Sequence, residues 1–222
     1  MSEIKSGKWY IKDAFEKWYR IPDYQRPYVW EKDQVIDLLD DISIACEKDA
    51  NGEYFLGSLV LKENNDKGYI EYDVLDGQQR LTTLFLLTAV VRDLTDSEQR
   101  KQTCHNSIFQ QGNVDDNIPE RLRIVFDIRD DVKVFVDEYI TKKNGITEQK
   151  IKELSQSKKI DTSIFNMANA ILNMQQYLQE RIAQDAKFLD KFFPFFRTKV
   201  LLIYVSSQNL DDAFRMFTVL NN

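Results

Sequence analysis

Asp73-Val74-Leu75-Asp76-Gly77-Gln78-Gln79-Arg80-Leu81-Thr82-Thr83 joins a β-rich segment to a helical one, with a single glycine between them. Residues 69–75 are rich in β-forming side chains, whereas residues 78–91 carry apolar side chains in every turn of a helix. We therefore predict a strand, a tight turn at Asp76-Gly77, and a helix that is buried on most of its sides.

The predicted turn has a geometry suited to anions. The first N–H groups of a helix lack intrahelical acceptors, and Gly77 would let a phosphate approach the backbone closely. Arg80 could add a bidentate clamp, while Gln78 and Gln79 could donate to phosphate or orient a water. Asp76 could hold a metal-bound water or accept a proton from it. The alternative for Asp76 is a simple helix cap, which is common for aspartate but leaves Gln-Gln-Arg unexplained.

A second stretch, Ile21-Pro22-Asp23-Tyr24-Gln25-Arg26-Pro27-Tyr28-Val29-Trp30, combines aromatic residues, an arginine and two prolines. The prolines predict an extended chain, along which side chains alternate. Tyr24 and Arg26 should therefore share one side. Tyr28 and Trp30 should continue that side, and Gln25 should face the other way. Aromatics beside an arginine suit a base and a phosphate; the alternative is an irregular entry strand whose aromatics belong to the core.

The remaining pattern predicts a mixed fold of helices and strands. Residues 54–61 and 69–75 should form an antiparallel hairpin. Residues 9–21 should give a strand, one helical turn and a second extended piece. Helices are expected at 31–47, 130–140, 163–182 (with Ser163 as the cap) and 188–196, and after Asn209. Strands are expected at 121–127 and 199–205, and a polar loop at 95–120.

The residue types present exclude several kinds of chemistry. His105 is the only histidine, and Cys46 and Cys104 are the only cysteines. A Cys/His metal site cannot be assembled from these residues, and we expect two reduced thiols. Ser-His-Asp and Cys-His mechanisms need a positioned imidazole, whereas we place His105 in the polar loop. Any chemistry should therefore rest on Asp, Glu, Arg, Gln and Thr.

Length and charge set further bounds. A chain of 222 residues with 43% hydrophobic residues can bury a substantial core, so we expect one domain, or one with a helical annex. No stretch approaches the roughly 18 apolar residues of a membrane-spanning helix, and there is no signal-peptide core, so we expect a soluble, cytoplasmic protein. A net charge of −6 argues against wrapping in nucleic acid but leaves a local basic groove open.

Four motifs together resemble one known family. IPDYQRPYVW (21–30), FLGSLVL (55–61), DGQQRLTTL (76–84) and DAFRMFTVLNN (212–222) occur in the order and roughly at the spacings of the N-terminal domains of GmrSD-type modification-dependent restriction endonucleases. The resemblance covers residues 21–94 and 199–222, whereas residues 95–198 carry no motif of the family. In the family the terminal motif continues into an arginine-glycine pair. Here Asn221 matches and that pair does not appear, so we expect the natural protein to continue.

The resemblance implies a nucleotide pocket and roles for particular residues. Asp76, Gln79 and Arg80 would be the hydrolysis residues, and Asp76 would also be the candidate magnesium ligand. Nucleotide and phosphate binding would fall to Gln25, Arg26, Gly77, Gln78, Thr82 and Thr83. Base stacking would fall to Tyr24, Tyr28 and Trp30, which remain ambiguous between pocket and core. Gly57, Ser58 and Asn221 are the remaining motif positions.

For the whole chain the resemblance implies an α+β, ParB/sulfiredoxin-like fold, with a small sheet, packed helices and a helical annex. Residues 1–94 and 199–222 would form the nucleotide-binding core, and residues 95–198 a mainly helical insertion. The implied cofactor is Mg²⁺ with a nucleoside triphosphate, and the implied partners are modified DNA and a C-terminal HNH-type nuclease domain. A homodimer remains open. A chain with one histidine lacks the ligands of that nuclease and should not cut DNA by itself.

Three hypotheses follow. The first is a regulatory domain of a phage-defence nuclease that hydrolyses a nucleoside triphosphate with magnesium. The second is a binding module that senses nucleotide or modified DNA without turnover. The third, a purely structural interaction domain, would leave both polar motifs without a purpose.

Overall fold

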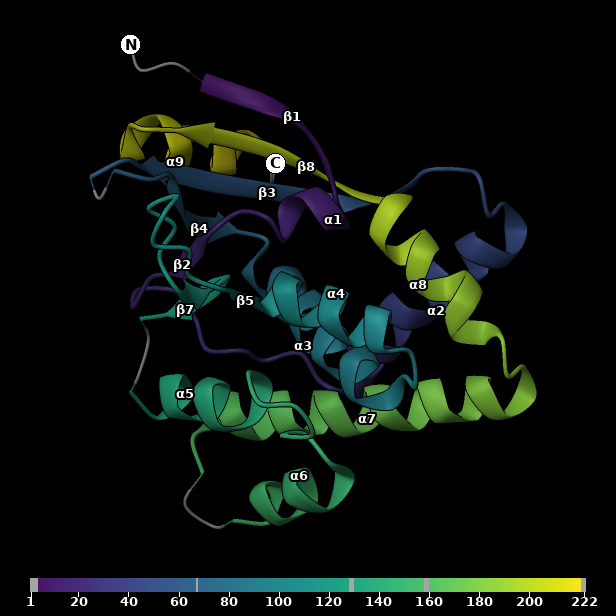
Figure 1. Ribbon diagram of the computed structural model, residues 1–222. Helices are drawn as coiled ribbons and strands as arrows, with labels where there is room; N and C mark the ends of the chain where they lie inside the picture. Colours follow the sequence, from purple (N-terminus) through teal and green to yellow (C-terminus); the bar gives the residue numbers. More distant parts are fainter. Residues whose placement is uncertain (1–3, 67, 128–129, 158–159, 221–222) are drawn as a thin grey trace.

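The protein is built around a mixed β-sheet with helices on both faces, as seen in a computed structural model that describes residues 4–66, 68–127, 130–157 and 160–220 (Figure 1). Within these residues the sheet has six strands in the order β1-β8-β3-β4-β2-β7. Their bounds are β1 (Ile4–Tyr10), β2 (Tyr19–Ile21), β3 (Tyr54–Asn64), β4 (Glu71–Asp76), β7 (Ile124–Phe126) and β8 (Val200–Ser207). The class is α+β, as the sequence predicts.

Strand pairing brings together segments that are far apart in the chain. β3 and β4 form the predicted antiparallel hairpin, in which Leu61 faces Val74. β8 pairs in parallel with β3 and antiparallel with β1, so it lies between them. β2 pairs in parallel with both β4 and β7, which places the start of the 21–30 segment beside β4. The end of β4 and the 21–30 segment therefore meet at one edge of the sheet.

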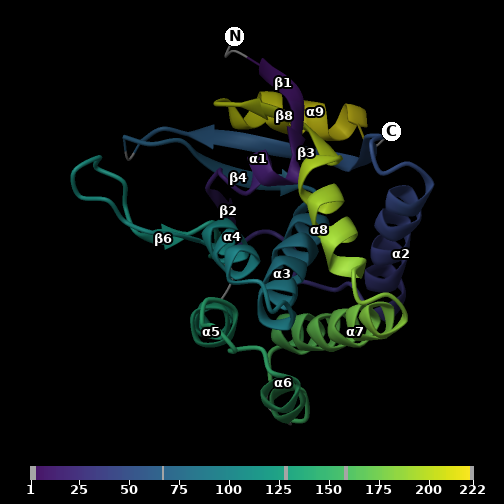
Figure 2. The ribbon, with the colours of Figure 1, turned by 45° about the vertical axis from the view of Figure 1, so that its right-hand side comes forward.

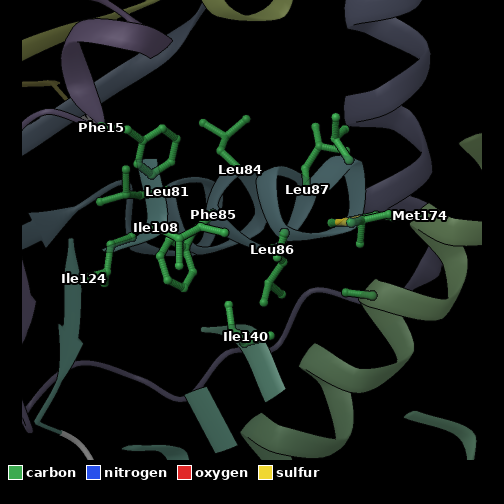
Figure 3. Packing of buried hydrophobic residues seen from close by; sticks show 14 of the residues in the cluster. Phe15, Leu81, Leu84, Phe85, Leu86, Leu87, Ile108, Ile124, Ile140 and Met174 are labelled. Carbon is green, nitrogen blue, oxygen red and sulfur yellow. The ribbon is translucent and has the colours of Figure 1, made fainter. Parts of the chain in front are cut away.

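Helix α3 (Gln78–Leu94) is the centre of the hydrophobic core. Leu81, Leu84 and Phe85 are completely buried, because the helix is covered on all sides rather than along one stripe. Figure 3 shows its side chains meeting Phe15 on one side, Ile108 and Ile124 on another, and Ile140 and Met174 beyond. The prediction of a helix buried on most sides is confirmed.

The other helices surround α3. α1 (Ile11–Ala14), α2 (Lys32–Lys48), α4 (Glu98–Ile108), α7 (Thr162–Gln184) and α8 (Phe188–Thr198) lie on the α3 side of the sheet, and α9 (Leu210–Leu220) lies on the opposite face (Figures 1 and 2). α5 (Asp130–Phe135) lies beside α7 and is followed by the π-helix η1 (Val136–Ile140), and α6 (Glu148–Ser155) packs on α7 farther from the sheet (Figures 1 and 2). A small hairpin of β5 (Phe109–Gln110) and β6 (Arg121–Leu122) projects beside α4.

Two expectations about the helices need correction, and one helix was not predicted. Residues 98–108 form a helix rather than part of a loop, so His105 lies on α4; Ser97 caps it by accepting from the Arg100 N–H, and Cys104 and Ile108 are fully buried. The cap of α7 is Asp161, which accepts from the Ser163 N–H, so the helix begins before Ser163. Helix α6 was not expected at all. Polar composition concealed both missed helices, since each buries only a few residues.

Residues 95–198 share the core of the rest of the chain. They supply strand β7 to the main sheet, and a single cluster of buried side chains includes Ile124, Met174 and Phe196 together with Leu59 and Leu202. The larger buried cluster of the described residues thus contains residues of both parts of the chain, and a second, small cluster of Val60, Leu75 and Ala213 lies apart from it. Within the described residues, no helix is long and apolar enough to cross a membrane.

Candidate functional site

A cavity of about 340 Å³ lies where β4 ends and α3 begins. Its walls come from three stretches of the chain: the 21–30 segment, the bulged part of β3, and the turn into α3. The lining residues are Gln25, Arg26, Trp30, Ser58, Asp76, Gly77, Gln78, Gln79 and Arg80. The structure thus brings together the three central motifs that the sequence singled out.

Gly77 shapes the floor of the cavity. Its φ of 86° is left-handed, and a Cβ atom there would lie 2.5 Å from Leu59 Cδ2 and 2.7 Å from the Ser58 carbonyl oxygen. Only glycine therefore fits between β3 and the first turn of α3. Gly77 is the N-cap of α3, and no side chain caps that end. The alternative role of Asp76 as a helix cap is thus not what the structure shows.

The N-terminus of α3 is open toward the cavity. The first intrahelical bond runs from the Leu81 N–H to the Gly77 carbonyl oxygen at 2.9 Å. The N–H groups of Gln78, Gln79 and Arg80 precede that bond and so have no intrahelical acceptor. Together with the helix dipole, they favour a negative group at this point.

Arg80 brings a positive charge into a partly buried position. Its Nη1 donates to the Ser58 carbonyl oxygen at 3.3 Å. Burial lowers the pKa of Arg80, and the nearby Asp76 opposes that shift. In the part of the chain that the structure describes, neither Arg80 nor Arg26 forms an ion pair within 4.0 Å. Two arginines with unused donors therefore line one cavity.

The lack of a side chain at Gly57 leaves space for the Arg80 guanidinium. A Cβ atom at this position would lie 2.5 Å from the centre of the Arg80 guanidinium, and the φ of Gly57 is 143°. A bulge in β3 at Phe55/Gly57 places the glycine there. The FLGS motif is thus explained by its contact with Arg80, and Ser58 lines the cavity through the same bulge.

The two glutamines hold the 21–30 segment against α3. Gln78 Nε2 donates to the Arg26 carbonyl oxygen at 3.0 Å. Gln79 Nε2 donates to the Pro27 carbonyl oxygen at 3.0 Å, and Gln79 Oε1 accepts from the Val29 N–H at 2.9 Å. The oxygen and the nitrogen of the Gln79 side-chain amide are therefore both hydrogen-bonded. The side-chain amide oxygen of Gln78, Oε1, has no hydrogen bond among the described residues.

The 21–30 segment is not regularly extended, so the predicted alternation of its side chains is wrong. The Gln25 N–H donates to the Pro22 carbonyl oxygen at 3.1 Å, which makes a turn after the first proline. Gln25 Nε2 then reaches the Leu75 carbonyl oxygen at 3.1 Å, on the same side as Arg26. A turn rotates successive side chains away from the two-residue repeat of a strand.

The three aromatics of the segment lie in different places. Tyr28 is fully buried, and its hydroxyl lies 2.8 Å from Thr83 Oγ1, so it belongs to the core and cannot stack on a ligand. Tyr24 is 57% exposed and lies outside the cavity wall. Only Trp30 lines the cavity. The ambiguity between pocket and core is thus resolved separately for each residue.

The predicted phosphate-binding role of Thr82 and Thr83 does not fit their position. Both side chains are completely buried, and Thr83 Oγ1 also donates to the Gln79 carbonyl oxygen at 2.8 Å. They lie on the same helix face as Gln78 and Gln79 but one turn further along α3, where the side chains are fully buried. Asn221 lies outside the described residues.

The carboxylate content of the cavity limits what it can hold. Asp76 is the only acidic residue of its wall, and within the described residues no group of three His, Cys, Asp or Glu side chains could hold a metal ion. A metal would therefore have to share its coordination with a ligand. Magnesium bound through one carboxylate and substrate phosphates meets that condition.

Comparison with protein families identifies the domain family to which the chain belongs. The model of the GmrSD restriction endonuclease N-terminal domain matches residues 7–222. The chain belongs to this family. GmrSD membership supports a role of the domain in restriction. The match spans 95–198 as well as the motif regions, so the helical part belongs to the GmrSD domain. No curated protein matches the chain significantly.

Two contacts of the 21–30 segment were missed by the sequence analysis. Ser163 and Asn166 on α7 bond to Tyr28, from 135 and 138 residues away along the chain. Nothing in the apolar stripe of α7 indicates these bonds. Only the three-dimensional arrangement reveals them.

Proposed function

We propose that this domain binds a nucleoside triphosphate in the cavity between β4 and α3 and hydrolyses it, as the regulatory part of a restriction endonuclease. The observation that carries the proposal is the convergence of Arg26, Arg80 and the uncapped start of α3 on one cavity. Two arginines without ion pairs to the described residues and a row of N–H groups without intrahelical acceptors would suit a multiply charged anion. The small sheet with packed helices is also what we expect of a ParB/sulfiredoxin-like core.

The phosphates would lie against the Gly77 turn, between the two arginines. Asp76 stands at the edge of this region and would hold the Mg²⁺ that accompanies the phosphates, leaving the remaining ligands to phosphate and water. Magnesium would neutralise phosphate charge there. Trp30 is the aromatic residue of the cavity wall and would contact the base.

For hydrolysis, the side-chain oxygen of Gln78, Oε1, could accept a hydrogen bond from a water. The side-chain amide of Gln79 is less available, because its oxygen and its nitrogen are both already hydrogen-bonded. Asp76 would then accept the proton of that water. Gln79 would act indirectly, by holding Pro27 and Val29 in place. The alternative function is a nucleotide or modified-DNA sensor without turnover, which is favoured by the single carboxylate of the cavity.

The test is titration calorimetry with each of the four ribonucleoside triphosphates and magnesium, with phosphate release measured on the same samples. Arg80→Ala should weaken binding at least about tenfold, because a charge-assisted contact is lost. Arg197→Ala on α8, whose guanidinium lies over the Phe193 ring and outside the cavity, is the matched control and should bind like wild type.

The outcomes separate the hypotheses. Binding that depends on Arg80, with phosphate release, supports the hydrolase. Binding without release supports the sensor. If no triphosphate binds to the wild type, the proposed function is wrong and the glycine turn serves the fold alone.

A further inference from the structure

The part of the 21–30 segment that lines the cavity belongs to no strand. A buried backbone outside a sheet needs other hydrogen-bond partners for its polar groups. Helix α3 supplies them for Arg26, Pro27 and Val29 through Gln78 and Gln79. The remaining residue, Tyr28, is bonded differently.

Both backbone groups of Tyr28 are bonded to α7. Its N–H donates to Ser163 Oγ at 3.2 Å, and its carbonyl oxygen accepts from Asn166 Nδ2 at 3.0 Å. Ser163 and Asn166 are three residues apart and so share one helix face. Asp161 fixes Ser163 in turn, by accepting from its N–H at 2.8 Å. The beginning of α7 is therefore a rigid support for one residue of the segment.

Tyr28 connects α7 to α3. Its backbone is held by α7, while its buried hydroxyl contacts Thr83 on α3. Arg26 and Trp30, the two cavity-lining residues of this part of the segment, stand two positions before and after it. A shift of Tyr28 would therefore move both.

We propose that Ser163 and Asn166 are positioning residues of the cavity, which fix Tyr28 and thereby set where Arg26 and Trp30 meet the ligand. The ligand itself rests on the proposed function. This assigns to the region 95–198, which carries no motif of its own, a direct part in building the site.

The geometry also predicts which arginine depends on α7. Arg80 is held by its own helix, by the Ser58 carbonyl oxygen and by the space above Gly57, none of which involves α7. Loss of the α7 contacts should therefore impair the contribution of Arg26 and leave that of Arg80 intact. A general loss of stability would affect both arginines alike.

The experiment uses Asn166→Asp, which keeps the size of the side chain but replaces the donor to Tyr28 with an oxygen. Asn173→Asp makes the same change two turns later, at a side chain that has no hydrogen bond among the described residues, and is the control. Hydrogen exchange without ligand should become at least about tenfold faster at Tyr28 and Val29 in Asn166→Asp only, without a change at residues 84–91.

Binding of a nucleoside triphosphate with magnesium should weaken about tenfold in Asn166→Asp, the size expected for a lost buried hydrogen bond. In an Arg26→Ala background the same change should keep only the part of its effect that acts through Trp30, whereas in an Arg80→Ala background the full effect should remain. Ser163→Ala should follow Asn166→Asp, and Ser163→Thr, which keeps the hydroxyl, should restore binding.

Two results would overturn the inference: unchanged exchange at Tyr28 and Val29, or equal effects of Asn166→Asp in the wild-type and Arg26→Ala backgrounds. If wild-type protein binds no triphosphate, the proposed function fails, but the exchange measurement still decides whether α7 fixes the segment.

Discussion

At the scale of single residues, the cavity depends on two glycines, which have no Cβ atom. Gly57 and Gly77 each leave a space that a neighbour occupies: the Arg80 guanidinium in one case, Leu59 and the Ser58 carbonyl oxygen in the other. The sequence placed both glycines in motifs but could not show which neighbour needs the space. The neighbour of Gly57 lies on helix α3 and the neighbours of Gly77 lie on β3, so both close approaches are set by tertiary contacts.

Gly57→Ala should displace Arg80 from the cavity. The added methyl group would collide with the guanidinium, which is the flexible end of its side chain, so the steric effect should fall on ligand binding. The positive φ should cost about 1–3 kcal/mol of stability. We expect triphosphate affinity close to that of Arg80→Ala, measured by calorimetry, and a moderately lower urea midpoint.

Gly68→Ala is the control for this substitution. Gly68 also has a positive φ, of 78°, but a Cβ atom there meets nothing within 4 Å. It should lose stability through backbone strain alone and keep wild-type affinity. Equal affinity losses in both variants would show that strain, and not the position of Arg80, controls binding.

At the scale of elements, α3 joins the cavity to the helical part of the chain. Its first turn faces the cavity, and near its other end Arg92, which is only 1% exposed, donates to the carbonyl oxygens of Ile140 and Lys142 at 2.7 Å each. Arg92 also pairs with Asp93. Ile140 is the last residue of the π-helix η1 and Lys142 follows its C-cap, so Arg92 donates to carbonyl groups at and just after the end of this helix.

Arg92→Leu should lower the free energy of unfolding by about 3–5 kcal/mol, because it leaves Asp93 without its partner and several carbonyl groups without donors. Urea denaturation measures the loss. Nucleotide affinity at the opposite end of α3 should stay within about twofold, since the first turn is held by β3 and by the 21–30 segment. A larger loss of affinity in folded protein would contradict that independence.

The helices and strands differ in how well the sequence predicts them. α2 and α7 were predictable because their apolar residues repeat with the helical period, whereas α3 and the β3–β4 hairpin were predictable from nearly continuous runs of apolar or β-forming residues. α4 was not, since its hydrophilic sequence carries only Cys104, Ser107 and Ile108 on its buried side. The residues of the cavity were predictable from their motifs, whereas the path of the 21–30 segment, set by contacts with α3 and α7, was not.

At the scale of the whole molecule, one hydrophobic core links the sheet to all the central helices. The three tryptophans, Trp9, Trp18 and Trp30, all lie in the first part of the chain, whereas much of the helix content lies in residues 95–198. Tryptophan fluorescence and far-ultraviolet circular dichroism thus report on different parts of the fold.

We expect the two signals to change together in urea, in a single transition, because a shared core makes the parts unfold cooperatively. The measurement follows both signals on the same samples. Separate midpoints would show that residues 95–198 unfold independently of the rest of the chain.

The position of β8 has a consequence for how the chain is made. β1 is the first strand to emerge from the ribosome, yet its neighbour in the sheet is β8, which is the last strand to be synthesised among the described residues. During translation the β3–β4 hairpin and α3 can form through local contacts. β1, and the side of β3 that pairs with β8, have no partner strand until β8 is synthesised. The sheet can therefore be completed only after residues 200–207 have been synthesised. A nascent chain stalled before them would expose the unpaired edges of β1 and β3 to chaperones.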